Sequence, residues 1–103
     1  MKIIQKLSDM VTDELDGAKC YIKMAIEQKE ERRGLADALY DISAQEMGHV
    51  NILHEQVSEI ISEYRKTKGE PPADMLAVYD YLHKKHIEMA NRIKVYQQMY
   101  KGL

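Results

Sequence analysis

The segment Ala44–Val50 reads AQEMGHV and lies in the middle of the longest helical pattern of this 103-residue chain. Glu46 and His49 are three residues apart, so on an α-helix their side chains share one face, about one turn apart. Both fall in an apolar stripe with alternating steps of three and four residues. The stripe runs through Leu35, Leu39, Ile42, Glu46, His49, Leu53, Gln56 or Val57, Ile60 and Tyr64. A carboxylate and an imidazole in such a seam are costly to bury unless a partner satisfies them, and a bound metal can satisfy both.

The stretch before this helix carries its own apolar stripe, which predicts a helix from about Ile3 or Ser8 to Glu31. Ser8 is a candidate N-cap, because its hydroxyl can accept a hydrogen bond from a free backbone N–H of the first turn. The charged run at residues 29–33 is expected to be a solvated helix end. Gly34 is expected to stop the helix as its C′ residue.

The central helix is expected to begin at Leu35 and to end near Arg65 or Lys66. Gly69 and the two prolines after it close the pattern, because glycine favours a helix stop and proline cannot continue a helix. A helix of about thirty residues is roughly 45 Å long at about 1.5 Å per residue, a length typical of helical bundles.

A third helix is expected to begin at Pro71 or Pro72, since proline is tolerated in a first helical turn, and to extend to about Lys101. No stretch shows the alternation of apolar and polar residues that is typical of a strand. The sequence therefore predicts an all-α fold in a single domain over residues 1–103. The expected architecture is a helical bundle subunit with two long antiparallel helices plus a third helix.

The composition excludes several classes of function. Fifteen Lys and Arg residues against seventeen Asp and Glu leave a formal charge of −2, and both signs are mixed, so no basic patch predicts nucleic-acid binding. Charges break every apolar run and no signal-peptide pattern begins the chain, so we expect neither export nor membrane insertion. The single Cys20 cannot form an internal disulfide, which favours a reducing cytoplasm. A chain this short buries a modest core alone, which favours a homodimer or larger homo-oligomer.

Glu14 lies in the stripe of the first helix, and Tyr21 follows two turns later on the same face. If the first helix packs antiparallel to the central one, Glu14 comes to lie opposite Glu46 and His49. Two neighbouring carboxylates repel each other, and a cation between them removes that cost. Oxygen and imidazole ligands suit iron, and alternatively manganese or zinc. In the metal-free alternative, Glu14 lies at a seam edge while Glu46 and His49 pair with each other or with Tyr21.

These residues resemble half of the di-iron carboxylate site of the ferritin-like superfamily, as in rubrerythrins, bacterioferritins and encapsulated ferritins. The resemblance covers roughly residues 7–65 and rests on Glu14, Tyr21 and the Glu-x-x-His motif of Glu46 and His49. It implies that the two glutamates are the terminal and bridging carboxylates and that the histidine is the imidazole ligand. The tyrosine resembles the one that lies near the site in the family.

The chain departs from the family pattern, because a full subunit has four long helices and two half-sites. Encapsulated ferritins resemble it most, since their short subunits dimerise and each subunit donates one half-site. The resemblance then implies a C2 dimer in which four carboxylates and two histidines surround two metals. Encapsulated ferritins usually carry a C-terminal extension that docks into a shell protein. Here only residues 101–103 follow Tyr100. An encapsulin-type shell partner therefore stays an alternative, and no docking tail supports it.

The third predicted helix offers a rival arrangement, because Asp80 and His83 form an Asp-x-x-His pair and His83 shares a face with His86. These residues could supply a degenerate second half-site within one chain. Their charged neighbours favour instead a largely wet surface for both histidines. His54 and Glu55 are likewise expected to be solvated.

Two glycines interrupt the middles of predicted helices. Gly17 and Gly48 each cost about 1 kcal/mol relative to alanine, and we expect them to permit close helix approach beside the site. Methionine and tyrosine at helical spacing are expected in the core. Cys20 is next to Tyr21 but off the main stripe, and it has no partner that would make it a nucleophile or a metal ligand.

Three functions are compatible with this pattern. The first is an iron-binding, ferritin-like protein that oxidises Fe(II) with dioxygen or peroxide at a di-iron site formed between subunits by Glu14, Glu46 and His49. In that function Tyr21 is the residue expected to assist proton-coupled chemistry. The second is a metal-free helical oligomerisation or interaction module in which the same polar residues set register and oligomeric state. The third binds metal for storage or structure without turnover.

Overall fold

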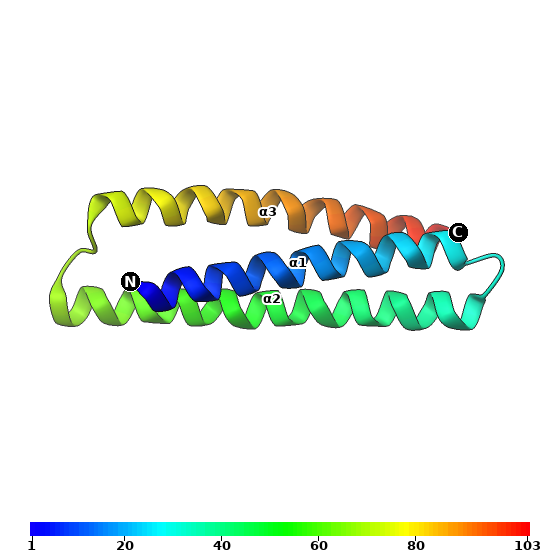
Figure 1. Cartoon of the computed structure of the whole chain (residues 1–103), viewed down its shortest axis with the longest axis horizontal. Coiled ribbons are helices and arrows are strands. Elements are labelled where there is room, and N and C mark those ends of the chain that lie inside the picture. The colour runs from blue at the N-terminus through cyan, green and yellow to red at the C-terminus, as the bar shows by residue number, and fades with distance from the viewer.

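The computed structural model describes all 103 residues and contains three α-helices and no strand. The helices are α1 (Lys2–Gln28), α2 (Arg33–Lys68) and α3 (Ala73–Gly102), and they form an elongated bundle with extents of 56 × 18 × 18 Å (Figure 1). The all-α prediction is therefore confirmed. None of the helices carries an uncharged apolar stretch of the length that crossing a bilayer requires.

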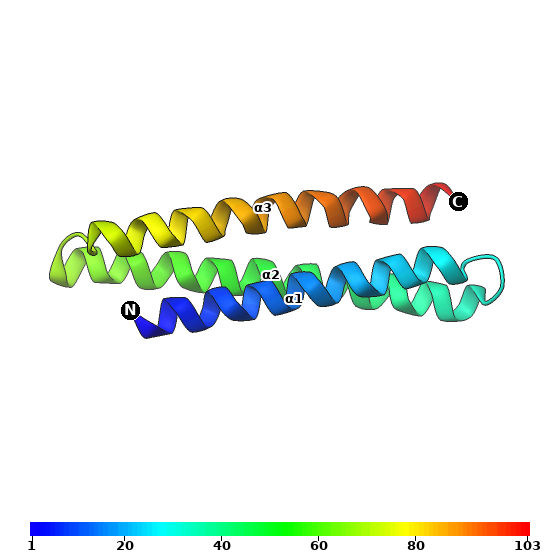
Figure 2. The same ribbon diagram turned by 45° about the horizontal axis from the view of Figure 1, so that its top comes forward.

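The chain reverses direction between α1 and α2 and again between α2 and α3, so consecutive helices run in opposite directions (Figure 1). α1 and α2 pack together along most of their length. α3 lies mainly against α1 and contacts α2 much less, and Figure 2 shows it to one side of the other two helices. α1 is therefore the shared partner of both other helices, and one side of the α1–α2 pair is left uncovered.

The start of α1 is fixed by packing and not by a capping side chain. Ser8 lies inside the helix and is buried, so its predicted role as an N-cap is wrong. The helix begins at Lys2, and Ile4 in its first turns packs with Val57 and Ile61 of α2. Burial of these apolar side chains stabilises the end of the helix without a capping residue.

The two connections differ in their backbone conformation. Gly34 lies in the first turn of α2, so the prediction that it stops the first helix is wrong. The break comes instead before Arg33, where Arg32 has φ −138° and ψ 76°. Gly69 ends α2 with φ +85°, a conformation that favours glycine because a Cβ would be strained there. Both prolines precede α3, with Pro72 at the N-cap position and not within the first turn.

Three apolar clusters form the core, and the central one draws on all three helices. Its buried members are Val11, Leu15, Ala18, Val50 and Ile93. Small residues allow α1 and α2 to approach closely here, and the Ser43 hydroxyl donates a hydrogen bond to the Ala18 carbonyl oxygen at 2.8 Å. The buried hydroxyl is thus satisfied within the core.

The buried row of α2 is shifted by about one residue from the predicted stripe. It comprises Ala36, Leu39, Ser43, Val50, Val57 and Ile61. Leu35 and His49 are exposed and Glu46 is half-buried, so the prediction that Glu46 and His49 occupy a buried seam is wrong. The small side chains of this row face α1 because the two backbones lie close together. Several of the larger residues of the predicted stripe are only half-buried, namely Ile42, Leu53, Ile60 and Tyr64.

The end of the bundle where α1 turns into α2 is closed by a polar group of Lys29, Asp37, Tyr40 and Tyr100, which we call the end cluster. Lys29 is buried, its ammonium donates to the Tyr100 carbonyl oxygen, and its Nζ lies 4.2 Å from the centre of the Tyr100 ring. The Tyr100 hydroxyl donates to Asp37, and the Tyr100 ring stacks on Tyr40 with centroids 5.0 Å apart. The expectation that residues 29–33 form a solvated end is therefore wrong for Lys29.

Candidate metal centre

Glu14 of α1 and Glu46 and His49 of α2 converge at the middle of the α1–α2 contact, and we call them the carboxylate cluster. One ligand atom from each of the three residues lies within 4.8 Å of the others. Glu14 and His49 are 35 residues apart in the sequence. They meet because the chain reverses between α1 and α2 and places the middles of the two helices side by side.

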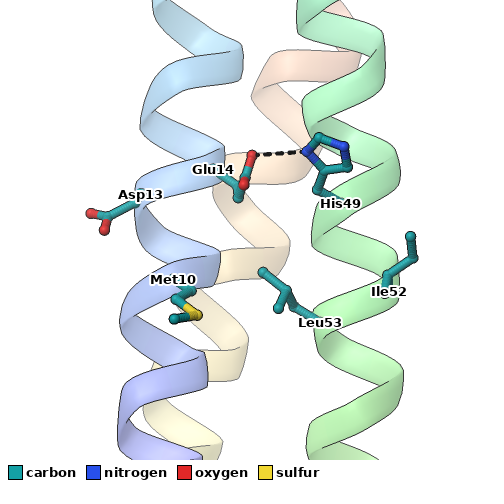
Figure 3. Close-up of a pocket in the computed structure, with 6 residues that line it drawn as sticks. All are labelled: Met10, Asp13, Glu14, His49, Ile52 and Leu53. Atoms are coloured by element: carbon teal, nitrogen blue, oxygen red, sulfur yellow. Dashed lines mark hydrogen bonds and ion pairs between the residues drawn. The ribbon is translucent and has the colours of Figure 1, made fainter.

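The contacts inside the carboxylate cluster are loose. His49 Nδ1 lies 3.4 Å from Glu14 Oε2 across the gap between the helices (Figure 3), which is long for a hydrogen bond between such groups. Glu46 extends toward α1, because a Cβ built on Gly17 would lie 3.8 Å from Glu46 Oε2. That separation is an ordinary van der Waals distance, so the space beside Glu46 would accept a methyl group at Gly17.

The carboxylate cluster lies at an open surface cavity. The cavity is lined by Met10, Asp13, Glu14, His49, Ile52 and Leu53, which we call the open face (Figure 3). The His49 side chain is 55% exposed and that of Glu14 is 28% exposed. In Figure 3 Asp13 points away from the other polar groups, so Asp13 lies at the rim and does not join the cluster. Apolar side chains therefore surround a polar centre that is open on its outer side.

Tyr21 lies on α1 two turns beyond Glu14 and is not part of the cavity lining. Seven residues correspond to about 10 Å along a helix at about 1.5 Å per residue. Tyr21 is half-buried and packs against the apolar cluster that includes Ile22 and Leu39. It makes no hydrogen bond with a residue of the carboxylate cluster in this single chain.

The rival ligands of α3 are not brought to the carboxylate cluster. His83 and His86 are half-buried and line a different cavity, together with His54 of α2, and Asp80 is exposed. The expectation that His54, His83 and His86 are solvated is therefore wrong. No sequence signal pointed to His54, because the burial of Val50, four residues earlier on the same side of α2, is itself a result of packing.

The carboxylate cluster offers two carboxylate groups and one imidazole to a cation. Ligand atoms about 2.1 Å from a single ion lie about 3 to 4.2 Å from one another. The three atoms here lie within 4.8 Å, so small side-chain rotations would bring all three into reach of one ion. Three protein ligands leave coordination positions open, and the exposure of His49 places those positions on the outer side.

Comparison of the chain with protein-family models, with curated proteins and with solved structures gave no match. The function is therefore argued from the geometry and chemistry of the site.

Proposed function

We propose that this protein is a ferritin-like iron-binding subunit that oxidises Fe(II) at a di-iron site shared by two copies of the chain. The observation that carries the proposal is the convergence of Glu14, Glu46 and His49 from two helices to within 4.8 Å. Carboxylates and an imidazole suit iron, and manganese or zinc are the chemical alternatives. The donor set contains no thiolate, which softer metals would prefer.

The exposure of the cluster supports sharing of the site between two copies. Each chain offers three ligand residues, which are too few for two bound iron ions, and its open side faces outward. Around it, Met10 is 51% exposed and Ile52 is 59% exposed. Exposed apolar groups around a polar centre are typical of an interface. A two-fold copy would bury them and would add its own Glu14, Glu46 and His49.

The proposed roles follow from the positions of the side chains. Glu14 and Glu46 would hold the metals and balance their charge, and His49 would complete the ligand set on the outer side. Two Fe(II) ions bound there would supply one electron each, which with two protons reduces hydrogen peroxide to water or dioxygen to hydrogen peroxide. Tyr21 does not touch the cluster of its own chain. We therefore propose that it assists proton transfer to the site of the partner copy, or to its own site through water.

A metal-free interaction module is the second candidate, and the exposed apolar side chains of the open face favour it equally. In that function the polar residues fix the register of two copies and bind no cation. A third candidate shares the metal site and holds the ion without turnover. Metal content separates the second candidate from the first, and reaction with dioxygen separates the third.

The test compares the natural chain with the double variant Glu46→Ala/His49→Ala after removal of metal and anaerobic loading with Fe(II). A di-iron site between two copies predicts about one bound iron per chain, lost in the double variant, and an absorbance change on admission of air. Glu59→Ala is the matched control, because Glu59 is an exposed carboxylate on the same helix outside the cluster. Its iron content should equal that of the natural chain.

The outcomes separate the three candidates. Absence of bound iron in the natural chain would remove the metal site, and a changed oligomeric state of the double variant would then support the metal-free module. Bound iron without oxidation in air would leave a storage or structural site. Tyr21→Phe should slow oxidation and leave iron content unchanged, and equal oxidation rates would remove Tyr21 from the proposed mechanism.

A further inference from the structure

A row of exposed side chains runs along α3 on a side that no other helix covers. Ile93 and Tyr100 are the only buried residues of this 30-residue helix. α3 lies at the edge of the bundle, with α1 and α2 both on one side of it (Figure 2). We call the row the α3 stripe, and its members, all of them exposed, are Val78, Tyr81, Lys85, Glu88, Arg92 and Val95.

The spacing of the α3 stripe is that of a helix–helix contact. Its members follow one another at alternating steps of three and four residues, which is the heptad spacing with which two helices pack along a shared seam. Val78 and Tyr81 at one end and Val95 at the other are each more than half exposed. A second helix laid along this row would therefore cover apolar side chains at both ends of the contact.

The middle of the α3 stripe carries the charged residues Lys85, Glu88 and Arg92, and none of them forms an ion pair within the chain. The Lys85 ammonium lies 5.0 Å from the centre of the Tyr81 ring, so this ring already faces a cation. Charges without partners in the single chain are free to pair with charges of a second helix.

The order of these residues makes the α3 stripe complementary to itself in one direction. In an antiparallel pair whose two-fold axis passes between Lys85 and Glu88, each of these residues faces the other one on the second copy. One step outward in the same register, Tyr81 faces Arg92, which suits a guanidinium on an aromatic ring. At the ends Val78 faces Val95. A parallel pair would place Lys85 against Lys85 and Glu88 against Glu88, and like charges in contact are unfavourable.

We propose that the α3 stripe binds a second copy of this chain, whose α3 packs antiparallel to the first from Val78 to Val95. The central charged layers set direction and register, and the apolar ends contribute the buried apolar area. The α3 stripe shares no residue with the open face. A chain with two different two-fold surfaces forms an assembly larger than a dimer. This contact requires no metal and does not depend on the proposed iron chemistry.

The first experiment tests the register by disulfide cross-linking of the full, metal-free chain. The background is Cys20→Ser/Ile52→Glu, which removes the exposed Cys20 and places a charge on the open face. In this background, mild oxidation of Val78→Cys/Val95→Cys should link position 78 of one copy to position 95 of the other. The two positions cannot bond within one chain, because about 25 Å of helix separates them.

The matched control is Asp80→Cys/Gln98→Cys in the same background, since both positions are exposed on α3 outside the α3 stripe. Cross-linking of the test pair should be faster by about tenfold or more, because association holds its thiols together. Equal rates for the two pairs would overturn the proposal and leave this face to a partner other than a second copy. Linkage of position 78 to itself, as in a parallel pair, would also overturn it.

The second experiment exchanges the central charges and measures self-association by sedimentation equilibrium in the Ile52→Glu background. Lys85→Glu and Glu88→Lys each bring like charges together and should weaken association by about tenfold or more. The double exchange Lys85→Glu/Glu88→Lys restores opposite charges and should recover it. Lys84→Glu is the control, because Lys84 is exposed on α3 outside the α3 stripe.

Two results of the charge exchange would contradict the antiparallel pair. The first is equal weakening by Lys84→Glu and Lys85→Glu, and the second is a double exchange that associates no better than the single variants. Circular dichroism of each variant checks that the helices are intact, as expected for substitutions of exposed side chains. Iron loading of the natural chain tests the carboxylate cluster separately, so either proposal can fail while the other stands.

Discussion

The end cluster and the carboxylate cluster are both polar groups at helix contacts, yet their hydrogen bonding is opposite. In the end cluster donors meet acceptors, since Lys29 donates to the Tyr100 carbonyl oxygen and the Tyr100 hydroxyl donates to Asp37. In the carboxylate cluster, acceptors converge and a single 3.4 Å contact joins Glu14 to His49. Polar groups that satisfy one another hold a fold together, whereas converging carboxylates with few protein donors suit an added cation.

Substitutions in the two clusters should therefore change different properties of the protein. Removing a member of the end cluster should lower the free energy of unfolding and leave metal binding by the folded chain intact. Removing a member of the carboxylate cluster should abolish metal binding and leave the metal-free chain at least as stable as before.

The largest expected effect is that of Tyr100→Ala. Tyr100 is buried and contacts Lys29, Asp37 and Tyr40, so truncation leaves a cavity and unpaired polar groups, with an expected loss of about 3–5 kcal/mol in the free energy of unfolding. Urea denaturation measures this loss. Met99→Ala is the control, because Met99 is exposed and should change the value by less than about 0.5 kcal/mol. Equal losses for both variants would contradict the structural role of the end cluster.

The next effect is a pH dependence that Tyr100→Phe should remove. Burial, and then the neighbouring Asp37, raise the pKa of Tyr100 to about 12 from its ordinary value of 10.0. Because the folded chain holds this proton more tightly, the stabilisation is complete below pH 10 and is lost as the pH rises through 12. By linkage this shift contributes at most about 2–3 kcal/mol, and less where solvent screens the hydroxyl.

The measurement is the difference in free energy of unfolding between the natural chain and Tyr100→Phe at a series of pH values. The difference should favour the natural chain at pH 8 and should shrink steadily between pH 10 and 12. The phenylalanine variant serves as its own control for lysine titration, since both chains have the same lysines. A difference that stays constant over this range would show that the phenol is not held by burial and Asp37.

A smaller effect of opposite sign is expected at the carboxylate cluster. In the metal-free chain, Glu14→Gln/Glu46→Gln removes two neighbouring negative charges, so the free energy of unfolding should rise, by at most about 1 kcal/mol because the groups are partly exposed. Chemical denaturation in the presence of a chelator measures it. A loss of more than about 1 kcal/mol would mean that these carboxylates stabilise the fold as those of an ordinary structural cluster do.

Much of the fold could be predicted because periodic apolar stripes and a glycine–proline break mark three helices. The proximity of Glu14 to Glu46 and His49 could also be predicted, since a chain reversal between two long helices aligns their middles. The buried face of α2, however, could not be predicted from the sequence. Two faces about one residue apart both carry apolar groups, and the interior one is chosen by the small size of residues such as Ser43, which the hydrophobic pattern does not reveal.

The end cluster and the cavity lined by His54, His83 and His86 could not be predicted, because both depend on the placement of α3. Lys29 is buried against a carbonyl oxygen 71 residues away in the sequence, and no local pattern indicates that partner. His83 and His86 face inward because Ile93 and Tyr100 fix the rotation of α3 by their burial. Because charged residues such as Lys84 and Lys85 lie between the two histidines, the sequence pattern indicated a solvated surface here.

The smallest expected effect comes from the matched substitutions Gly17→Ala and Gly48→Ala, which compare the surface beside Glu46 with an exposed surface of α2. Gly17 lies beside Glu46, whereas Gly48 is exposed with no atom within 4 Å of a Cβ built on it. Alanine is the better helix former, so in the metal-free monomer each substitution should raise the free energy of unfolding by about 0.5 kcal/mol. Neither glycine has a positive φ, so neither substitution strains the backbone.

The two variants should differ only where a second copy covers the open face. A methyl group on Gly17 would lie 3.8 Å from Glu46 Oε2 and would crowd a partner that packs against this carboxylate, so Gly17→Ala should weaken iron binding and dimerisation while Gly48→Ala should not. Sedimentation at several concentrations and iron titration measure both properties. If the two variants assemble and bind iron alike, no second copy packs closely on Gly17. If only Gly17→Ala binds iron and dimerises less well while its metal-free stability rises, a second copy of the chain packs beside Glu46.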